Sequence, residues 1–118
     1  MKRNKDYSCA LGCPVEAVLD LIDGKWKGVI LYHLLNHGML RFNEMRRRLT
    51  GVTQRTLTKQ LRELEESGLI TRTVYAEVPP RVEYRLSERG ESLEQVIRAL
   101  QEWGENYLIE REQTKRVA

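Results

Sequence analysis

The residues with the clearest chemical potential are basic side chains concentrated between Arg41 and Arg62. This segment has a net charge of +6, because it contains seven basic residues and one acid, Glu44, whereas the whole 118-residue chain carries +3. A basic belt on an otherwise slightly acidic chain indicates a partner rich in phosphate groups. A solvated, charged helix face is the alternative. The seven basic residues are Arg41, Arg46, Arg47, Arg48, Arg55, Lys59 and Arg62.

Polar side chains within this belt have the chemistry needed to distinguish nucleotide bases. Glutamine suits the edge of adenine, arginine or lysine suits guanine, and threonine suits a phosphate or the methyl group of thymine. The neighbouring arginines would contact backbone phosphates and set the register on a duplex. The residues expected to contact double-stranded DNA are therefore Arg41, Arg46, Arg47, Arg48, Thr53, Gln54, Arg55, Thr56, Thr58, Lys59, Arg62 and Arg81.

A different chemistry is available at the two cysteines, Cys9 and Cys13. Cys13 directly precedes Pro14, a residue favoured at the first position of a helix, so its sulfur would lie at the positive end of a helix dipole. That position favours the thiolate, which oxidants and electrophiles attack. We therefore hypothesise a redox- or electrophile-responsive switch at Cys13, with Cys9 as a second candidate thiol. An inert cysteine that fills a gap near an interface is the alternative.

The cysteines, together with two histidines, also raise the alternative of a metal site. His33 and His37 are one helical turn apart, and two cysteines could complete a tetrahedral set of ligands. A place on an apolar helix face explains His33 without a metal, and a place beside Gly38 explains His37. We therefore expect no metal and no other cofactor.

The spacing of apolar residues, prolines and glycines predicts several helices and one short hairpin that would position these side chains. Thr53 is a typical N-cap for the polar, basic segment, and Val52 and Leu57 have the spacing of a hydrophobic staple. Pro79 and Pro80 predict a stiff exposed hairpin tip. The expected helices are 14–22, 25–36, 42–49, 53–67 and a final one of about twenty residues after Ser87, and the expected strands are 39–41, 69–75 and 81–86.

The same spacing predicts which face of each element is buried. In strand 81–86, alternation places Val82, Tyr84 and Leu86 in the core and Arg81, Glu83 and Arg85 in water. The other expected buried sets are Val15, Val18, Leu19 and Ile22 in the first helix, Trp26, Val29, Ile30, His33 and Leu34 in the second, and Leu57, Leu61 and Leu64 in the fourth.

This order of elements predicts a winged helix-turn-helix, a mostly α fold with a small β-hairpin wing (α+β). The final helix carries a long apolar set that a minimal domain does not need, and we expect a homodimer with the N- and C-terminal helices as its interface. The alternative is that both helices fold back on their own domain. The expected organisation is a basic tail at 1–12, one domain at 13–109 and a frayed charged tail at 110–118.

Six motifs in the chain together resemble the HxlR-type transcriptional regulators, winged helix-turn-helix proteins related to the MarR group. The motifs are Cys13–Glu16, Gly24–Trp26, Arg41–Glu44, Leu57–Glu65, Gly68–Ile70 and Pro79–Tyr84. The resemblance implies a cytoplasmic homodimer that binds a partly palindromic operator. It also implies that the cysteine before the first helix, here Cys13, senses electrophiles or oxidants in several members. Cys9 lies outside the family motif.

The function predicted from these observations is a DNA-binding transcriptional regulator, and family analogy makes it a repressor. A winged helix used only for protein contact is the alternative, but it would not need the cluster Arg46–Arg48. The chain has no glycine-rich phosphate loop, nucleophile elbow or clustered histidine and carboxylates, so an enzyme is not expected. It has neither a membrane-spanning apolar run nor the apolar core of a signal peptide, and we expect a cytoplasmic location.

Overall fold

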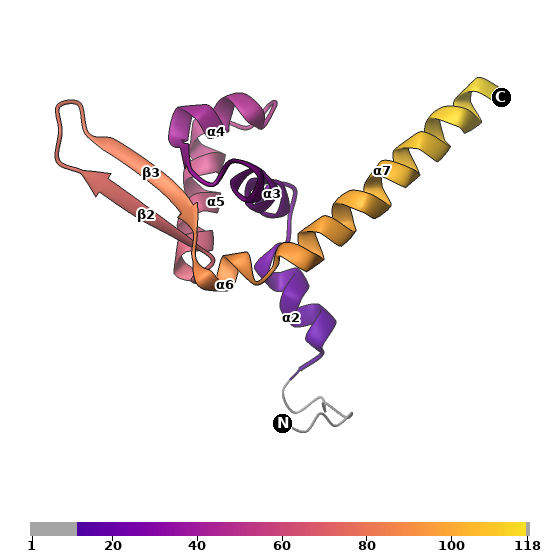
Figure 1. Ribbon diagram of the computed structural model, residues 1–118, viewed down its shortest axis with the longest axis horizontal. Coiled ribbons are helices and arrows are strands. Elements are labelled where there is room, and N and C mark those ends of the chain that lie inside the picture. Colours follow the sequence, from indigo (N-terminus) through magenta and orange to yellow (C-terminus); the bar gives the residue numbers. More distant parts are fainter. Residues whose placement is uncertain (1–11, 118) are drawn as a thin grey trace.

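The computed structural model describes residues 12–117, which form a helical body, a β-hairpin and a long C-terminal helix (Figure 1). The predicted α+β winged helix-turn-helix is confirmed in its order of elements. In chain order the elements are α2 (Pro14–Leu21), α3 (Lys27–His37), β1 (Leu40–Arg41), α4 (Phe42–Arg48), α5 (Gln54–Glu66), β2 (Ile70–Tyr75), β3 (Arg81–Leu86), α6 (Glu88–Glu91) and α7 (Glu94–Val117).

The three strands form one antiparallel sheet in the order β1–β3–β2. In the wing hairpin, Ile70 pairs with Leu86 and Tyr75 pairs with Arg81. The short strand β1 pairs with β3 through Leu40–Tyr84 and Arg41–Glu83. The hairpin tip extends away from the helices in Figure 1. The sheet therefore holds the wing at a fixed position relative to α4 and α5.

The core lies where α3, α4 and α5 pack against the base of the sheet. Leu57, Leu61 and Leu64 are almost fully buried along one side of α5, as their helical spacing predicts. They join a cluster whose other buried members include Ile30, Leu31, Leu34, Leu40, Met45, Leu49, Val52, Leu69, Ile70 and Ile97. This cluster fixes the orientation of α5, so that its opposite side faces outward.

The two N-terminal helices differ from the prediction in which side chains they bury. No residue of α2 is buried, and Val15 and Leu19 are 64% and 55% exposed, so the expected buried stripe is wrong within one chain. In α3, Val29 is exposed, whereas Lys27 and Leu31 are buried in addition to Ile30 and Leu34. Trp26 and His33 are only partly buried. The reason is geometric, because helix periodicity identifies an apolar face but does not show whether another element covers it.

The expected alternation in β3 is wrong at one position, because Glu83 is only 4% exposed. β3 is the central strand, so β1 and β2 flank Glu83 on both sides. Its carboxylate accepts from Arg81 at 3.4 Å and lies 3.0 Å from Arg85 Nη1. Two cations therefore compensate a carboxylate that alternation would place in water.

The final helix also differs from the prediction, because the chain forms two helices after Ser87 instead of one. α6 packs against β3, whereas α7 packs against α3 and continues to Val117, where a frayed tail was expected. The break at Ser92–Leu93 allows the two helices to follow different neighbours. α7 projects well beyond the body in Figure 1. No helix within residues 12–117 combines the length and the apolar character needed to cross a membrane.

Candidate nucleic-acid interface

The exposed side of α5 carries the predicted recognition residues. Thr53 caps the helix, since its Oγ1 accepts from the Thr56 amide at 3.0 Å, and Val52 and Leu57 are both buried next to this cap. With the three leucines turned inward, polar and basic side chains line a shallow hollow on the outer side. They are Gln54, Arg55, Thr58, Lys59 and Arg62.

These side chains are not equally available to a ligand. Gln54, Arg55, Lys59 and Arg62 are exposed, whereas the predicted contacts Thr56 and Thr58 are partly buried. Lys59 Nζ lies 3.2 Å from Glu63 Oε2, one turn further along the helix. Within residues 12–117, Arg55 and Arg62 have no ion-pair partner. The two arginines are therefore the cations of this surface whose charge is least compensated.

A second group of cations lies on α4. Arg46, Arg47 and Arg48 are exposed in the last turn of the helix, where cations also interact favourably with the helix dipole. The exposed Arg41 side chain lies just before α4, and its backbone amide donates to Glu44 Oε1 at 2.8 Å. Arg41 and Arg47 line a groove that runs to the tip end of the wing hairpin at Pro80 and Arg81. Of the predicted phosphate-contacting residues, Arg41 and Arg47 are thus brought next to the wing.

Arg81 differs from the other predicted contacts because it is paired with two carboxylates. Its guanidinium lies 3.0 Å from Glu77 Oε2 and 3.4 Å from Glu83 Oε2, and it stacks over the ring of Tyr75 at 3.9 Å. A phosphate would have to compete with two carboxylates for this side chain. The geometry therefore gives Arg81 a role in holding the tip end of the wing hairpin.

Cys13 occupies the N-cap position of α2 and is an exposed free thiol. Its backbone carbonyl accepts the first hydrogen bond of the helix, from Ala17 N at 2.9 Å. The sulfur is thus open to reagents at the end of a helix that itself carries exposed apolar residues. Cys9, the second candidate thiol, lies outside the described residues.

The two histidines stack on each other, with ring centroids 6.3 Å apart. Burial lowers the pKa of His33, and the nearby charge of Arg48 lowers it further. His33 Nδ1 is buried and has no hydrogen-bond partner within residues 12–117. The same part of the chain contains no group of three potential metal-ligating side chains close enough to share an ion.

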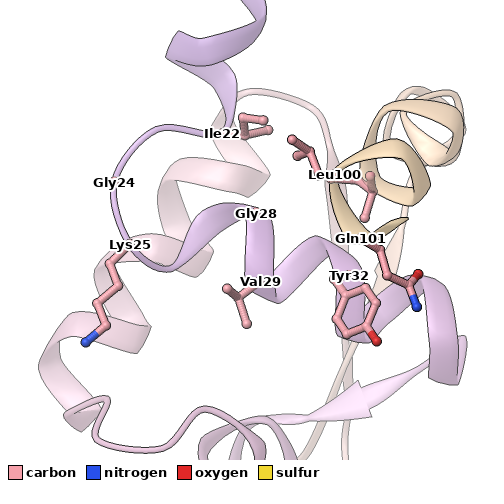
Figure 2. Close-up of a pocket in the computed structure, with 9 residues that line it drawn as sticks. Ile22, Gly24, Lys25, Gly28, Val29, Tyr32, Leu100 and Gln101 are labelled. Carbon is pink, nitrogen blue, oxygen red and sulfur yellow. The ribbon is translucent and has the colours of Figure 1, made fainter. Parts of the chain in front are cut away.

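A cavity of about 350 Å³ lies between the turn before α3, α3 itself and α7 (Figure 2). Ile22, Val29, Ile97 and Leu100 give it an apolar lining, with Tyr32 and Gln101 together at one side. It adjoins the exposed apolar residues of α2 and α7. On α7 these residues are Val96, Leu100, Trp103, Tyr107, Leu108 and Ile109.

Trp103 is the most exposed of the large apolar residues on α7, at 71%, and its ring stacks on Tyr107 with centroids 5.6 Å apart. An exposed aromatic pair on a projecting helix is typical of a surface that associates with another protein. The alternative expectation was that both terminal helices fold back onto their own domain. Only the first turns of α7 pack against α3, and the rest of the helix projects away from the body.

Comparison with known proteins gives a consistent result. A model of the HxlR-like helix-turn-helix family matches residues 21–112 of the chain. The uncharacterized HTH-type transcriptional regulator YdeP of Bacillus subtilis (strain 168) is 58% identical over 96 residues, which cover 81% of this chain and 74% of YdeP. Both matches include the whole segment from α3 to the wing.

Solved structures with the same fold extend this similarity. The redox regulator HypR in its reduced form has a TM-score of 0.77 and 53% identity, and the match covers 80% of this chain and 92% of HypR. A MarR-family transcriptional regulator from Enterococcus faecalis V583 has a TM-score of 0.74 and 37% identity, with 96% of each chain covered. The winged helix-turn-helix and its terminal helices are thus shared with solved regulator structures.

Proposed function

The chain belongs to the HxlR-like helix-turn-helix family and is a transcriptional regulator; from this premise we propose that it binds a pseudo-palindromic operator as a homodimer and represses transcription in the cytoplasm. The exposed side of α5 carries the proposal. It combines side chains for base recognition with cations for phosphates, and further arginines line a separate groove between α4 and the wing. A recognition helix of this kind fits the major groove, with its first residues closest to the bases.

Dimerisation would follow from the apolar surface on the terminal helices. The side chains of Val15, Leu19 and Trp103 are each more than half exposed in the isolated chain. A second copy would cover them through an isologous contact, in which the same surface is used twice. A two-fold axis would place the two α5 helices to read half-sites about one helical turn, roughly 34–36 Å, or a multiple of it, apart.

Cys13 would couple this assembly to a chemical signal. It lies at the start of α2, which we place at the dimer contact. Its exposed thiol would add across the carbon–carbon double bond of a quinone-type electrophile, which opens the π bond, forms a carbon–sulfur bond and transfers the thiol proton to the adduct. A bulky adduct there would disturb the contact and reorient the two recognition helices. The similarity to HypR, which is described as a redox regulator in both reduced and oxidized forms, supports this role.

Binding to a fluorescent duplex from the chain's own promoter region tests the DNA-binding proposal. Arg55→Ala and Lys59→Ala should each weaken binding about tenfold or relax one base position, since a specific base contact contributes about 1–3 kcal/mol. Lys115→Ala, which removes one cation from the far end of α7, is the matched control. Affinity should also fall steeply as salt is added. Unchanged affinity and specificity in both α5 variants would contradict the proposal.

A further inference from the structure

A series of ion pairs connects the interior of the protein with the outer side of α5. Lys27 lies at the first position of α3, and its side chain is only 10% exposed. Its ammonium group lies 2.9 Å from Glu63 Oε1 and 3.4 Å from Asp23 Oδ1. The other oxygen of Glu63, Oε2, lies 3.2 Å from Lys59 Nζ. Glu63 therefore bridges a buried lysine and a lysine of the candidate DNA-binding surface.

The position of Glu63 creates an electrostatic problem for DNA binding. It is a carboxylate on the recognition helix, one turn from Lys59, and its side chain is 35% exposed. An uncompensated negative charge there would repel phosphates and hold the Lys59 ammonium against the protein. The cation that Glu63 needs comes from Lys27 of α3, whose side chain is almost entirely buried.

The protonation states agree with this geometry. The hydrogen bond to Glu63 raises the pKa of Lys27 and outweighs the opposing effect of burial. The hydrogen bonds from Lys27 and then Lys59 lower the pKa of Glu63. Lys27 and Glu63 are therefore both charged at neutral pH. Asp23 is a weaker partner of Lys27, because its side chain is 62% exposed and its contact is longer.

We propose that Lys27 is a positioning residue for DNA recognition, which partly neutralises Glu63 from inside the protein and so weakens the competition of Glu63 with the nucleic acid for the Lys59 ammonium. This inference rests on the proposed DNA-binding function, since it assigns a role within that surface. Lys27 itself touches no DNA. It also joins the N-terminal end of α3 to α5, and thereby fixes the register of the recognition helix on the core.

The proposal predicts a specific pattern of duplex affinities for two variants and their combination. Lys27→Met leaves Glu63 to compete for Lys59, and affinity should fall about fivefold at roughly 0.1 M salt. The slope of log affinity against log salt should become shallower by up to about 0.9, the amount expected for one lost phosphate contact. Removing the carboxylate as well, in Lys27→Met/Glu63→Gln, should restore both affinity and slope to at least the wild-type values.

The single variant Glu63→Gln is a second test, which removes the carboxylate and keeps the buried Lys27. It should raise duplex affinity about threefold to tenfold and steepen the salt slope, because Lys59 is then free. Glu66→Gln is the matched control, since it removes an exposed carboxylate of the same helix that has no ion pair within residues 12–117. Glu66→Gln should change the duplex affinity and the salt slope clearly less than Glu63→Gln does. Circular dichroism of every variant verifies the fold before titration.

Several results would overturn the inference. If Lys27→Met and the double variant bind equally weakly, Lys27 acts only through packing. If Glu63→Gln and Glu66→Gln change affinity and slope by the same amount, the position of Glu63 has no special effect. If Lys27→Met does not fold, this second comparison alone decides the question. Failure of the wild-type chain to bind any duplex from its locus would instead refute the proposed function.

Discussion

Gly90 in α6 provides a test of how the wing is joined to the helical body. An ideal Cβ at this position would lie 2.1 Å from the Leu69 carbonyl oxygen and 3.1 Å from Leu86 Cδ2. The same carbonyl accepts from the Ser87 amide at 2.9 Å, and Ser87 Oγ donates to the Gly68 carbonyl oxygen at 2.5 Å. α6 and the start of β2 are therefore in direct backbone contact, which leaves no space for a side chain.

Gly90→Ala should lower the free energy of unfolding by about 2–4 kcal/mol. Overpacking against a backbone atom costs about 1–3 kcal/mol. If α6 moves away to relieve it, the hydrogen bonds of Ser87 lengthen, and each contributes about 1 kcal/mol. The better helix propensity of alanine returns no more than about 1 kcal/mol. The net loss is a large part of the roughly 5–15 kcal/mol by which a domain of this size is stable.

Urea denaturation followed by circular dichroism measures this loss, and thermal unfolding should show a midpoint lower by about 8–16 °C. Gly28→Ala is the control, because a Cβ at Gly28 meets no atom within 4 Å. It should leave stability unchanged or raise it by less than about 1 kcal/mol. A Gly90→Ala protein as stable as the wild type would refute the close contact between α6 and the Leu69 carbonyl.

Three further outcomes are expected. Burial lowers the pKa of His33 from 6.5, so its contribution to stability is fully present above pH 6.5 and is lost as the pH falls through the lowered folded-state value. Denaturation midpoints measured against pH should therefore decline over this range, and His33→Phe should make the decline smaller. Trp103→Ala should weaken the proposed homodimer by about tenfold or more in sedimentation equilibrium, whereas an unchanged dimer would exclude α7 from the contact. DNA binding by Cys13→Ser should resist diamide and quinones, and equal sensitivity in the variant would argue against the switch.

Helix α5, the proposed recognition helix, was predictable from the sequence because its signals are local. The Thr53 cap, the Val52–Leu57 staple and the leucine spacing all lie within fifteen residues, and the structure confirms each of them. Periodicity then determined which side of the helix carries the polar residues. The strands of the wing were predictable for the same reason, since alternation and prolines mark them independently of the rest of the chain.

The features that the sequence did not reveal depend on contacts between distant segments. Glu83 is buried because β1 and β2 flank it, and Lys27 is buried because Glu63 lies 36 positions further along the chain and supplies its countercharge. Charged residues in these positions resemble solvated ones in sequence. Val29 was misassigned because no local signal shows which of two adjacent apolar helix faces meets the core.

The order of strands leaves β2 at the margin of the sheet, with its outer hydrogen-bonding groups unpaired among residues 12–117. An edge strand of this kind can pair with a strand of another polypeptide, which is a common route to aggregation. Here the strand is only six residues long, and the cationic Arg72 lies at its middle, paired with Glu65. The short length and the charge protect this edge against self-association, and Arg72 is the residue to retain when the hairpin is redesigned.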